Sequence, residues 1–334
     1  MTFVPTDCGP DNAALARLAR LPHVPLGHYP TPVEELTRLR EALGGGPRLL
    51  VKRDDAIPFG FGGNKVRKLQ YVLAEALASG ADTIVTCGGV QSNHARATTA
   101  AARRHGLHPV LVANGTPPDR PTANALLDQL MGAEIHYVAG REDRHPAMEA
   151  QAARLRAEGR HPYVVPLGAS TPLGALGYVH AVTELLEQIP APDVIVHACS
   201  SGGTQAGLLA GCALHAIPTR VIGISADDPA GDVAQAVRRT IAGMGALLGV
   251  DGEALAVQCR VEVRDDFVGE GYGIPSNGSR EAQSLLARTE ALFVDHTYTA
   301  KALGAMIHLI RNGAIRPDQV ILFWHTGGQV GLFA

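Results

Sequence analysis

"VRKLQYVLAEALASGADTIVTC", residues 66–87, decides the fold class that we predict for this chain. Its first part is rich in alanine and leucine, and Gly80 is a suitable residue to end a helix there. The apolar residues recur at the spacing of one helical face, namely Val66, Leu69, Leu73, Ala76 and Leu77. The β-branched run at 82–87 then predicts a buried strand. A helix that leads directly into such a strand is typical of βαβ units.

The same alternation of strand and helix patterns runs through most of the chain. Short β-branched, apolar runs predict strands at 48–53, 82–87, 108–113, 193–198, 219–225 and 319–324. Longer Ala/Leu-rich stretches between them predict helices, so we expect an α/β fold with open, twisted, mainly parallel sheets. In "HPYVVPLGASTPLGALG", residues 161–177, Pro and Gly interrupt the pattern, which predicts a crossover between two domains.

Composition excludes several classes of function. The 334-residue chain has a net charge of −3 with basic and acidic residues interspersed, which disfavours binding to nucleic acid or to an anionic membrane. Its five cysteines are widely spread without a CxxC pair, so neither a disulfide framework nor a metal site is expected. The sequence has no apolar run of membrane-spanning length and no N-terminal signal pattern, so we expect a soluble, cytoplasmic protein.

Lysine is rare in this chain. Of the 29 basic residues only four are lysines: Lys52, Lys65, Lys68 and Lys301. An arginine-rich composition explains the scarcity, but it does not explain why two lysines are retained in "FGFGGNKVRKLQY", residues 59–71. Arginine stays charged in proteins, whereas a desolvated lysine can lose its proton and attack a carbonyl carbon. The cluster therefore indicates a nucleophilic amine.

Four loops at predicted strand ends carry polar side chains, and ligands in open α/β sheets bind at such ends. The loops are "GGNKVRK" (62–68), "CGGVQSNHAR" (87–96), "CSSGGTQAG" (199–207) and "HTGGQ" (325–329). In the second loop, Ser92 and Asn93 also suit the N-cap of the following helix. The third loop combines hydroxyls with backbone N–H groups at a helix start, which is typical of a phosphate site.

The motifs limit which phosphate-containing ligand the third loop is suited to bind. The third loop matches neither GxxxxGK[ST] nor GxGxxG, which disfavours a nucleotide cofactor. The sequence contains no HExxH pair and no GxSxG elbow, which weakens the zinc-protease and serine-hydrolase alternatives. An activated lysine together with a small phosphate site suggests pyridoxal phosphate, whose aldehyde reacts with an amine.

Six motifs in a fixed order cover nearly the whole chain. They are "GGNKVRKL", "GGVQSNHAR", "SSGGTQAG", "GYGIPSNGSREA", "YTAKAL" and "HTGG". Together they resemble the D-cysteine desulfhydrase and 1-aminocyclopropane-1-carboxylate (ACC) deaminase family of fold type II pyridoxal phosphate enzymes. The resemblance implies a large domain of residues 1–56 and 167–334, a small domain of residues 57–166, and a cofactor in the cleft between them. It also implies a homodimer and a small amino-acid substrate.

The resemblance implies roles for the residues of these motifs. Lys65 holds the cofactor covalently and is the base in proton transfer, and Lys68 reaches the phosphate. Asn93 lies beside the phenolic oxygen of the cofactor, and Ser92, Asn93 and His94 lie where the substrate carboxylate is held. The phosphate loop comprises Ser200, Ser201, Gly202, Gly203 and Thr204.

Four further motif residues bear on the type of reaction. Tyr272 in "GYG" and Tyr298 in "YTAK" match active-site tyrosines of the family, which are candidates for proton transfer or leaving-group contact. Thr299 and Thr326 stand where the deaminases resemble "YEGK" and "HLGG", whose glutamate contacts the pyridine nitrogen of the cofactor. A carboxylate there would stabilise a delocalised carbanion better than hydroxyls do. The two threonines therefore favour β-elimination over the opening of a cyclopropane ring.

The expected reaction is β-elimination on D-cysteine, which gives pyruvate, ammonia and sulfide. Ile57, Pro58 and Phe59 depart from the family pattern before the lysine motif, and Gln329 does so after "HTGG". We expect residues 57–61 and Gln329 to line the substrate pocket.

Other functions remain open at this point. L-Cysteate, with sulfite as leaving group, is an alternative substrate, and its sulfonate would need an extra cation from His94, Arg96 or His296. ACC deamination and a non-catalytic pyridoxal phosphate or amino-acid sensor are further alternatives, because a fold does not by itself specify a function.

Overall fold

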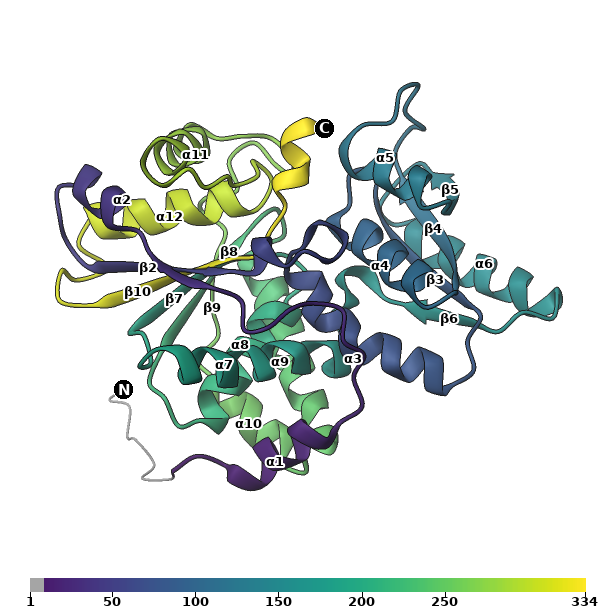
Figure 1. Cartoon of the computed structure of the whole chain (residues 1–334), viewed down its shortest axis with the longest axis horizontal. Coiled ribbons are helices and arrows are strands. Elements are labelled where there is room, and N and C mark those ends of the chain that lie inside the picture. Colours follow the sequence, from purple (N-terminus) through teal and green to yellow (C-terminus); the bar gives the residue numbers. More distant parts are fainter. Residues whose placement is uncertain (1–8) are drawn as a thin grey trace.

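The computed structural model describes residues 9–334 and contains two β-sheets with helices on both faces (Figure 1). The larger sheet has six strands in the order β1-β2-β10-β7-β8-β9. These strands are β1 (Val33–Glu35), β2 (Arg48–Arg53), β7 (Val194–Cys199), β8 (Arg220–Ser225), β9 (Glu262–Arg264) and β10 (Val320–His325). Neighbouring strands are parallel, except that the edge strand β1 runs antiparallel to β2.

The smaller sheet has four parallel strands in the order β5-β4-β3-β6. They are β3 (Thr83–Gly89), β4 (His108–Asn114), β5 (Glu134–Val138) and β6 (Pro162–Val165). Two open, mainly parallel sheets with flanking helices confirm the predicted fold class.

The six predicted strands are all present, and each begins within one residue of its predicted start. The sequence did not reveal β1, β5, β6 and β9. Both β1 and β9 have only three residues and lie at a sheet edge, so their apolar pattern is too short to detect. Every residue of β5 is only partly buried, and β6 begins at a proline inside the segment that we interpreted as a crossover alone.

Alternating side chains explain why the larger sheet is covered on both faces. In β7, Val194 and Val196 belong to the core under one layer of helices, whereas Ile195 and Cys199 belong to the core under the other. The first layer contains α2 (Thr37–Ala42), α11 (Asn277–Glu290) and α12 (Thr299–Arg311). The second contains α1 (Asn12–Arg20), α7 (Pro172–Gln188), α8 (Gly203–Leu214), α9 (Ala230–Leu248) and α10 (Gly252–Gln258) (Figure 1).

The smaller sheet has α3 (Asn64–Ala78) and α4 (Asn93–Arg104) in the core on one face and α6 (Arg144–Ala157) on the other. Helix α5 (Ala123–Leu130) lies against α4. Four short 3-10 helices complete the structure: η1 (Asp54–Ala56), η2 (Phe59–Phe61), η3 (Leu167–Ala169) and η4 (Gln329–Phe333). The predicted domain division falls in the segments between η1 and η2 and between β6 and η3, and the division itself stays a prediction.

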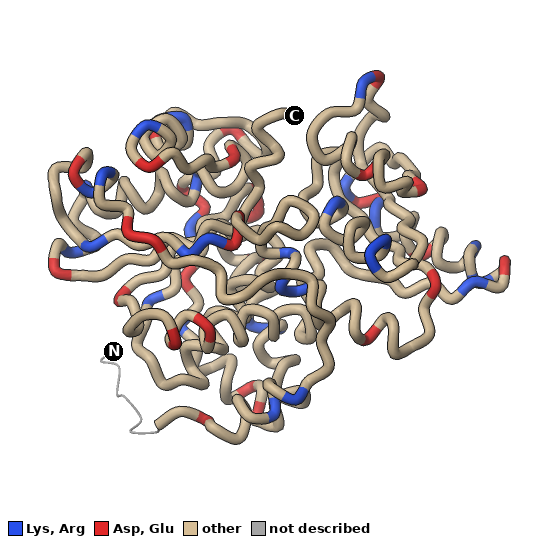
Figure 2. Tube along the Cα trace, in the orientation of Figure 1, with Lys and Arg blue, Asp and Glu red and all other residues tan. Residues whose placement is uncertain are grey.

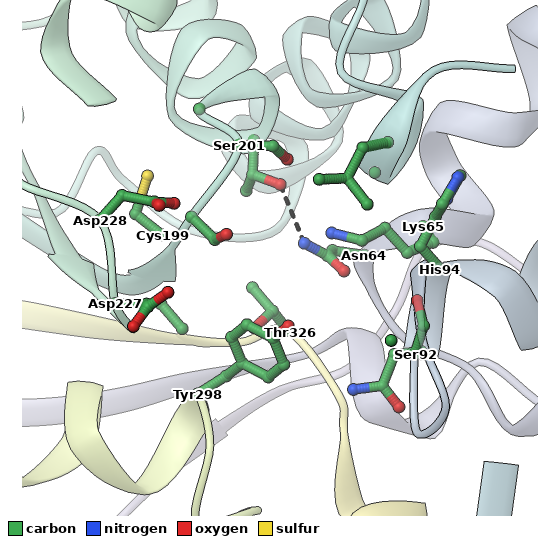
Figure 3. A pocket seen from close by; sticks show the side chains of 18 of the residues that line it. Asn64, Lys65, Ser92, His94, Cys199, Ser201, Asp227, Asp228, Tyr298 and Thr326 are labelled. Carbon is green, nitrogen blue, oxygen red and sulfur yellow. Dashed lines mark hydrogen bonds between the residues drawn. The ribbon is translucent and has the colours of Figure 1, made fainter. Parts of the chain in front are cut away.

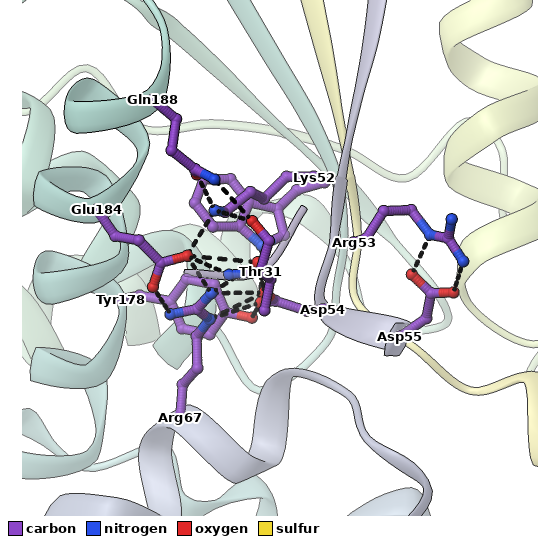
Figure 4. Close-up of polar contacts among 10 residues, drawn as sticks. Thr31, Lys52, Arg53, Asp54, Asp55, Arg67, Tyr178, Glu184 and Gln188 are labelled. Atoms are coloured by element: carbon purple, nitrogen blue, oxygen red, sulfur yellow. Dashed lines mark hydrogen bonds and ion pairs between the residues drawn. The ribbon is translucent and has the colours of Figure 1, made fainter. Parts of the chain in front are cut away.

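Helix α3 contacts α7 of the larger sheet as well as α4, and a buried charge network fixes it there (Figure 4). Arg67 of α3 donates to both carboxylate oxygens of Asp54 at 2.9 Å and to Glu184 of α7 at 2.8 Å. Lys52 of β2 also donates to Glu184, and to the Thr31 carbonyl at 2.8 Å. A buried charge is costly unless it is paired, so the network specifies one position for the helix that carries the lysine motif.

Charges of both signs are interspersed along the described part of the trace (Figure 2). Among residues 9–334, none of the helices is long and apolar enough to span a membrane.

Candidate active site

A cavity of about 200 Å³ lies between the two sheets, where the carboxyl ends of their parallel strands meet (Figure 3). Gly89, Asn114, Cys199, Asp227 and Thr326 line it from the ends of β3, β4, β7, β8 and β10. The predicted site residues that line it are Lys65, Lys68, Ser92, Asn93, His94, Ser200, Ser201, Gly202, Thr204, Tyr272, Tyr298 and Thr326. The fold therefore brings together residues from all six motifs.

Lys65 lies in the first turn of α3, directly after a loop that only glycine accommodates. Gly62 and Gly63 have φ values of 68° and 96°, in the left-handed region, and an added Cβ on Gly62 would stand 2.6 Å from the Ile57 carbonyl oxygen. The Asn64 N–H donates to the Thr326 carbonyl at 3.0 Å, so the loop is attached to the end of β10.

The amine of Lys65 is suited to nucleophilic chemistry. Within residues 9–334 it has neither a hydrogen-bond partner nor a carboxylate in ion-pairing range. Burial in the cavity lowers the pKa of Lys65 from its ordinary 10.5 to about 8. A useful fraction of this amine is therefore neutral near physiological pH, as attack on a carbonyl requires.

Lys68 lies next to the predicted phosphate loop. Its Nζ donates to the Ser170 hydroxyl at 2.9 Å and to the Gly168 carbonyl at 3.2 Å, and the Ser170 and Ser201 hydroxyls are 2.7 Å apart. Burial, and then the nearby charge of Lys65, hold the pKa of Lys68 well below its ordinary value. No carboxylate in the described chain pairs with this amine, so a bound anion would have no competitor there and would favour the charged form of Lys68.

The phosphate loop opens α8, whose first backbone N–H groups have no partner within the helix. Gly202 adopts the left-handed conformation at the N-cap, and an added Cβ on Gly203 would stand 2.7 Å from the Ser170 hydroxyl oxygen. The Asn64 side-chain amide donates to the Thr204 hydroxyl at 3.0 Å and joins the lysine motif to this loop (Figure 3). The sequence analysis did not single out Asn64, because only the charge of the adjacent Lys65 indicated a function there.

These residues fit pyridoxal phosphate. The cofactor needs a carbonyl-reactive amine and a site for a phosphate dianion. Lys65 offers the amine, whereas Lys68, the hydroxyls and the start of α8 offer hydrogen-bond donors for the phosphate.

Comparison with known proteins agrees with this chemistry. The family model described as "Pyridoxal-phosphate dependent enzyme" matches residues 24–327. The chain belongs to the pyridoxal-phosphate-dependent enzyme family. A D-cysteine desulfhydrase from Salmonella typhi is 38% identical over 329 residues, which cover 96% of this chain and 98% of the relative.

Two solved structures show the same fold as this pyridoxal-phosphate-dependent enzyme. An "ACC deaminase homologue" has a TM-score of 0.88 and 35% identity, with 96% of each chain covered. Threonine deaminase isoform 2 from Solanum lycopersicum has a TM-score of 0.69 with 15% identity, and covers 98% of this chain and 88% of its own. The predicted family and cofactor are therefore confirmed.

In the second loop of this family member, Ser92 is the N-cap of α4, and its hydroxyl accepts from the Ala95 N–H at 3.1 Å. His94 bonds the Thr86 hydroxyl through Nε2 at 2.8 Å and the Thr98 hydroxyl through Nδ1 at 3.4 Å. Burial, followed by the charges of Lys65 and Lys68, keeps the pKa of His94 well below its ordinary value. A neutral ring with both nitrogens occupied has no donor left for a carboxylate, so the contacts do not support His94 as a substrate-binding residue.

Two tyrosines form one polar unit in the cavity wall. The Tyr272 and Tyr298 hydroxyls are hydrogen-bonded to each other, and their rings meet edge to face at 5.7 Å. Arg141, between β5 and α6, stacks over the Tyr272 ring at 4.9 Å and pairs with Asp227 after β8. Neither Arg141 nor Asp227 belongs to a recognisable motif, so only the fold identifies them as lining residues.

Three predicted site residues do not line the cavity. Gly203 packs against Ser170, while the Thr299 hydroxyl donates to Asp295 at 2.7 Å in the first turn of α12. The side-chain amide of Gln329 donates to the Asp55 carbonyl at 3.0 Å and likewise lies outside the lining.

The predicted pocket role of residues 57–61 is also wrong in this structure. Ile57 belongs to the core of the smaller sheet, and Phe61 is exposed to solvent. None of these five residues lines the cavity.

Proposed function

We propose that this enzyme catalyses β-elimination on a small amino acid, with D-cysteine as its preferred substrate. The balanced reaction converts D-cysteine and water to pyruvate, ammonia and hydrogen sulfide. The observation that carries the proposal is the partly neutral amine of Lys65 in a cavity lined by hydroxyl groups. One of these hydroxyls belongs to Thr326, which replaces the leucine of the deaminase motif "HLGG". The 38% identity to a D-cysteine desulfhydrase supports the choice of substrate.

Lys65 is the proposed proton carrier. When bound, pyridoxal phosphate supplies an electron sink for the charge that develops at the substrate Cα. The Lys65 amine holds the cofactor before the substrate binds and takes the Cα proton afterwards, and a pKa of about 8 suits a base near neutral pH. We assign Lys68, with Ser200, Ser201, Gly202, Gly203 and Thr204, to the phosphate.

The other wall of the cavity faces the leaving group in this proposal. Burial raises the pKa of Tyr272, and burial followed by the neighbouring Tyr272 raises the pKa of Tyr298 well above its ordinary value. Both phenols therefore stay protonated at neutral pH and are able to donate a hydrogen bond to the departing sulfide. Ser92 and Asn93, at the start of α4, are assigned to the substrate carboxylate.

Elimination of sulfite from L-cysteate is the second candidate, and the charges near the cavity disfavour it. Arg96 and His296 lie outside the lining, and the His94 ring is neutral. Arg141 and Arg144 do line the cavity, but Asp227 and Asp228 line it with them. A sulfonate would meet two carboxylates together with two guanidinium groups, which provides no net attraction.

The test is a substrate panel with the purified, cofactor-loaded enzyme. D-Cysteine, L-cysteine, L-cysteate, D-serine, β-chloro-D-alanine and ACC are compared by kcat/KM, with pyruvate, 2-oxobutyrate, sulfide and sulfite measured separately. We expect the highest kcat/KM with D-cysteine and equal amounts of pyruvate and sulfide. A preference for L-cysteate or ACC would overturn the substrate assignment, and no turnover of any compound would favour the sensor alternative.

We also propose a homodimer in the cytoplasm. Leu126 and Leu130 of α5 and Phe333 of η4 are large exposed apolar side chains on elements that contact each other. Such a patch suits a second copy of the chain. Light scattering coupled to size exclusion measures the mass, and a mass of one chain at micromolar concentration would refute the dimer.

A further inference from the structure

Two neighbouring side chains contact the amide oxygen of Asn93. Its Oδ1 accepts a hydrogen bond from Asn124 Nδ2 at 3.0 Å and lies 3.5 Å from Nη1 of Arg96. Asn93 begins α4 and lines the cavity, whereas Asn124 belongs to α5 and is fully buried. No sequence motif marked Asn124.

The orientation of the Asn124 amide follows from its partners. Its Oδ1 accepts from Arg96 Nη1 at 3.1 Å, and its Nδ2 donates to the Gln91 carbonyl at 3.0 Å. A guanidinium only donates hydrogen bonds and a backbone carbonyl only accepts them, so the oxygen and nitrogen of this amide cannot be exchanged. The nitrogen of Asn124 therefore faces Asn93, and Asn93 must present its oxygen to it.

These hydrogen bonds fix the orientation in which the Asn93 amide faces the cavity. Because its oxygen is directed at Asn124 and Arg96, its Nδ2 donor group is the part that is free. In the described chain, no protein acceptor bonds that NH₂ group. The side chain is thus prepared to donate to an oxygen, and an anionic oxygen is the strongest acceptor.

Arg96 also holds the loop that precedes Lys65. Its Nη2 donates to the Gly62 carbonyl at 2.9 Å, and burial lowers the pKa of Arg96 to about 10. Within residues 9–334 it forms no ion pair with a carboxylate. Burial of a guanidinium is costly, and the nearby Asp128 offsets only part of this cost. The Nη donors of Arg96 go to Asn93, Asn124 and Gly62, while its Nε has no partner in the described chain.

We propose that Arg96 and Asn124 are positioning residues that fix the Asn93 amide with its NH₂ group toward the cavity, where it donates to the anionic ring oxygen of bound pyridoxal phosphate. This inference rests on the part of the proposed function that puts Asn93 beside that oxygen. It does not depend on which amino acid the enzyme consumes.

The direction of the effect follows from charge. A donor at the ring oxygen withdraws negative charge from the neighbourhood of the lysine nitrogen that holds the cofactor. If the Asn93 amide turned over, its oxygen would face the ring oxygen, and the protonated form of that nitrogen would be stabilised. The pKa at which the visible band of the bound cofactor titrates would then rise.

The test is a pH titration of the visible absorption band of the holoenzyme without substrate. Asn124→Asp is the main variant, because the new carboxylate still pairs with Arg96 but has no donor for Asn93, whose amide must turn to donate to it. We expect the pKa of the band to rise by about one unit or more in Asn124→Asp and in Asn93→Ala. The double variant should show no larger shift than Asn93→Ala alone, because both changes act on one hydrogen bond.

The controls separate positioning from folding. Asn277→Asp makes the same chemical change at an exposed residue and should titrate as the wild type does. Asn124→Ala removes the constraint without adding charge, so it should shift the pKa in the same direction by less, and it serves if Asn124→Asp does not fold. Unchanged titration in folded Asn124 variants, or additive shifts in the double variant, would overturn the proposal. Because no substrate is used, failure of the D-cysteine assay would leave this result unaffected.

Discussion

Gly177 of α7 lies so close to Arg67 of α3 that an added Cβ would stand 2.2 Å from the Arg67 carbonyl oxygen. This approach lets the two helices pack backbone to backbone, and it brings the Arg67 side chain to Asp54 and Glu184. The position of the helix that carries Lys65 therefore depends on the glycine at position 177 as well as on buried charges.

Gly177→Ala should destabilise the protein because α3 must move away from α7. We expect a loss of about 2 kcal/mol or more in the free energy of unfolding, as for other overpacked cores. Gly231→Ala in α9 is the matched control, since nothing lies within 4 Å of its Cβ position. The control should be neutral or stabilising by about 0.5 kcal/mol. Urea unfolding measures both, and equal stability of the two variants would contradict the packing argument.

Glu184→Gln should weaken the protein in a pH-dependent way. Burial opposes ionisation of Glu184, but hydrogen bonding and the charges of Arg67 and Lys52 outweigh it and lower its pKa from 4.5 to about 2. A lowered carboxyl pKa contributes stability above pH 4.5, and this contribution is lost as the pH falls toward 2. We expect a loss of about 3 kcal/mol at pH 7.

The difference between wild type and Glu184→Gln should therefore shrink between pH 4.5 and 2 in denaturant titrations. Glu187→Gln on the same helix is the control, because Glu187 takes part in none of the ion pairs of the network. A difference that stays constant with pH would show that the charge of Glu184 is not what stabilises the fold.

Lys65→Met should abolish turnover and covalent attachment of the cofactor, which borohydride reduction followed by mass spectrometry detects. Without cofactor, the same variant should be more stable than the wild type at pH 7, by up to about 3 kcal/mol, because no ammonium is buried. The folded pKa of about 8 lies below the ordinary 10.5, so wild-type stability should rise with pH across that interval and approach that of the variant.

Arg104→Met, at an exposed position of α4, is the control and should show no such gain. If the cofactor-free Lys65→Met protein were less stable than the wild type at pH 7, burial of this amine would not be costly.

Tyr298→Phe should lower kcat by roughly tenfold to a hundredfold while the absorption of the bound cofactor stays unchanged, since a hydrogen bond to a charged group contributes about 1.5–3 kcal/mol. Tyr272→Phe should have a similar effect. The double variant should lower kcat by less than the product of the two single effects, because the two hydroxyls are hydrogen-bonded to each other. Tyr163→Phe is the control, because Tyr163 does not line the cavity. A Tyr298→Phe enzyme with full kcat would exclude this tyrosine as a hydrogen-bond donor to the leaving group.

The sequence predicted most of the candidate site because its motifs stand at strand ends, and the carboxyl ends of parallel strands meet at one edge of a sheet. The strand ends predicted the loops that carry Lys65, Lys68 and Ser201, and the resemblance to the family implied the role of each residue. It placed Gln329 and residues 57–61 in the pocket only because they depart from a family pattern, and an unusual residue is not thereby a lining residue. Gln329 bonds the Asp55 carbonyl instead, and Ile57 is in the core.

The sequence by itself determined the α/β class, the family and the cofactor, because local periodicity and short motifs are properties of neighbouring residues. It also predicted Lys65 as the residue that holds the cofactor. The tertiary structure alone decided which side chains meet across long separations. Arg141 reaches Asp227, Asn64 reaches Thr204, and Asn124 sets the orientation of Asn93. Hydrogen bonds and ion pairs act over a few ångströms in space, so no pattern along the chain reveals them until the sheets have formed.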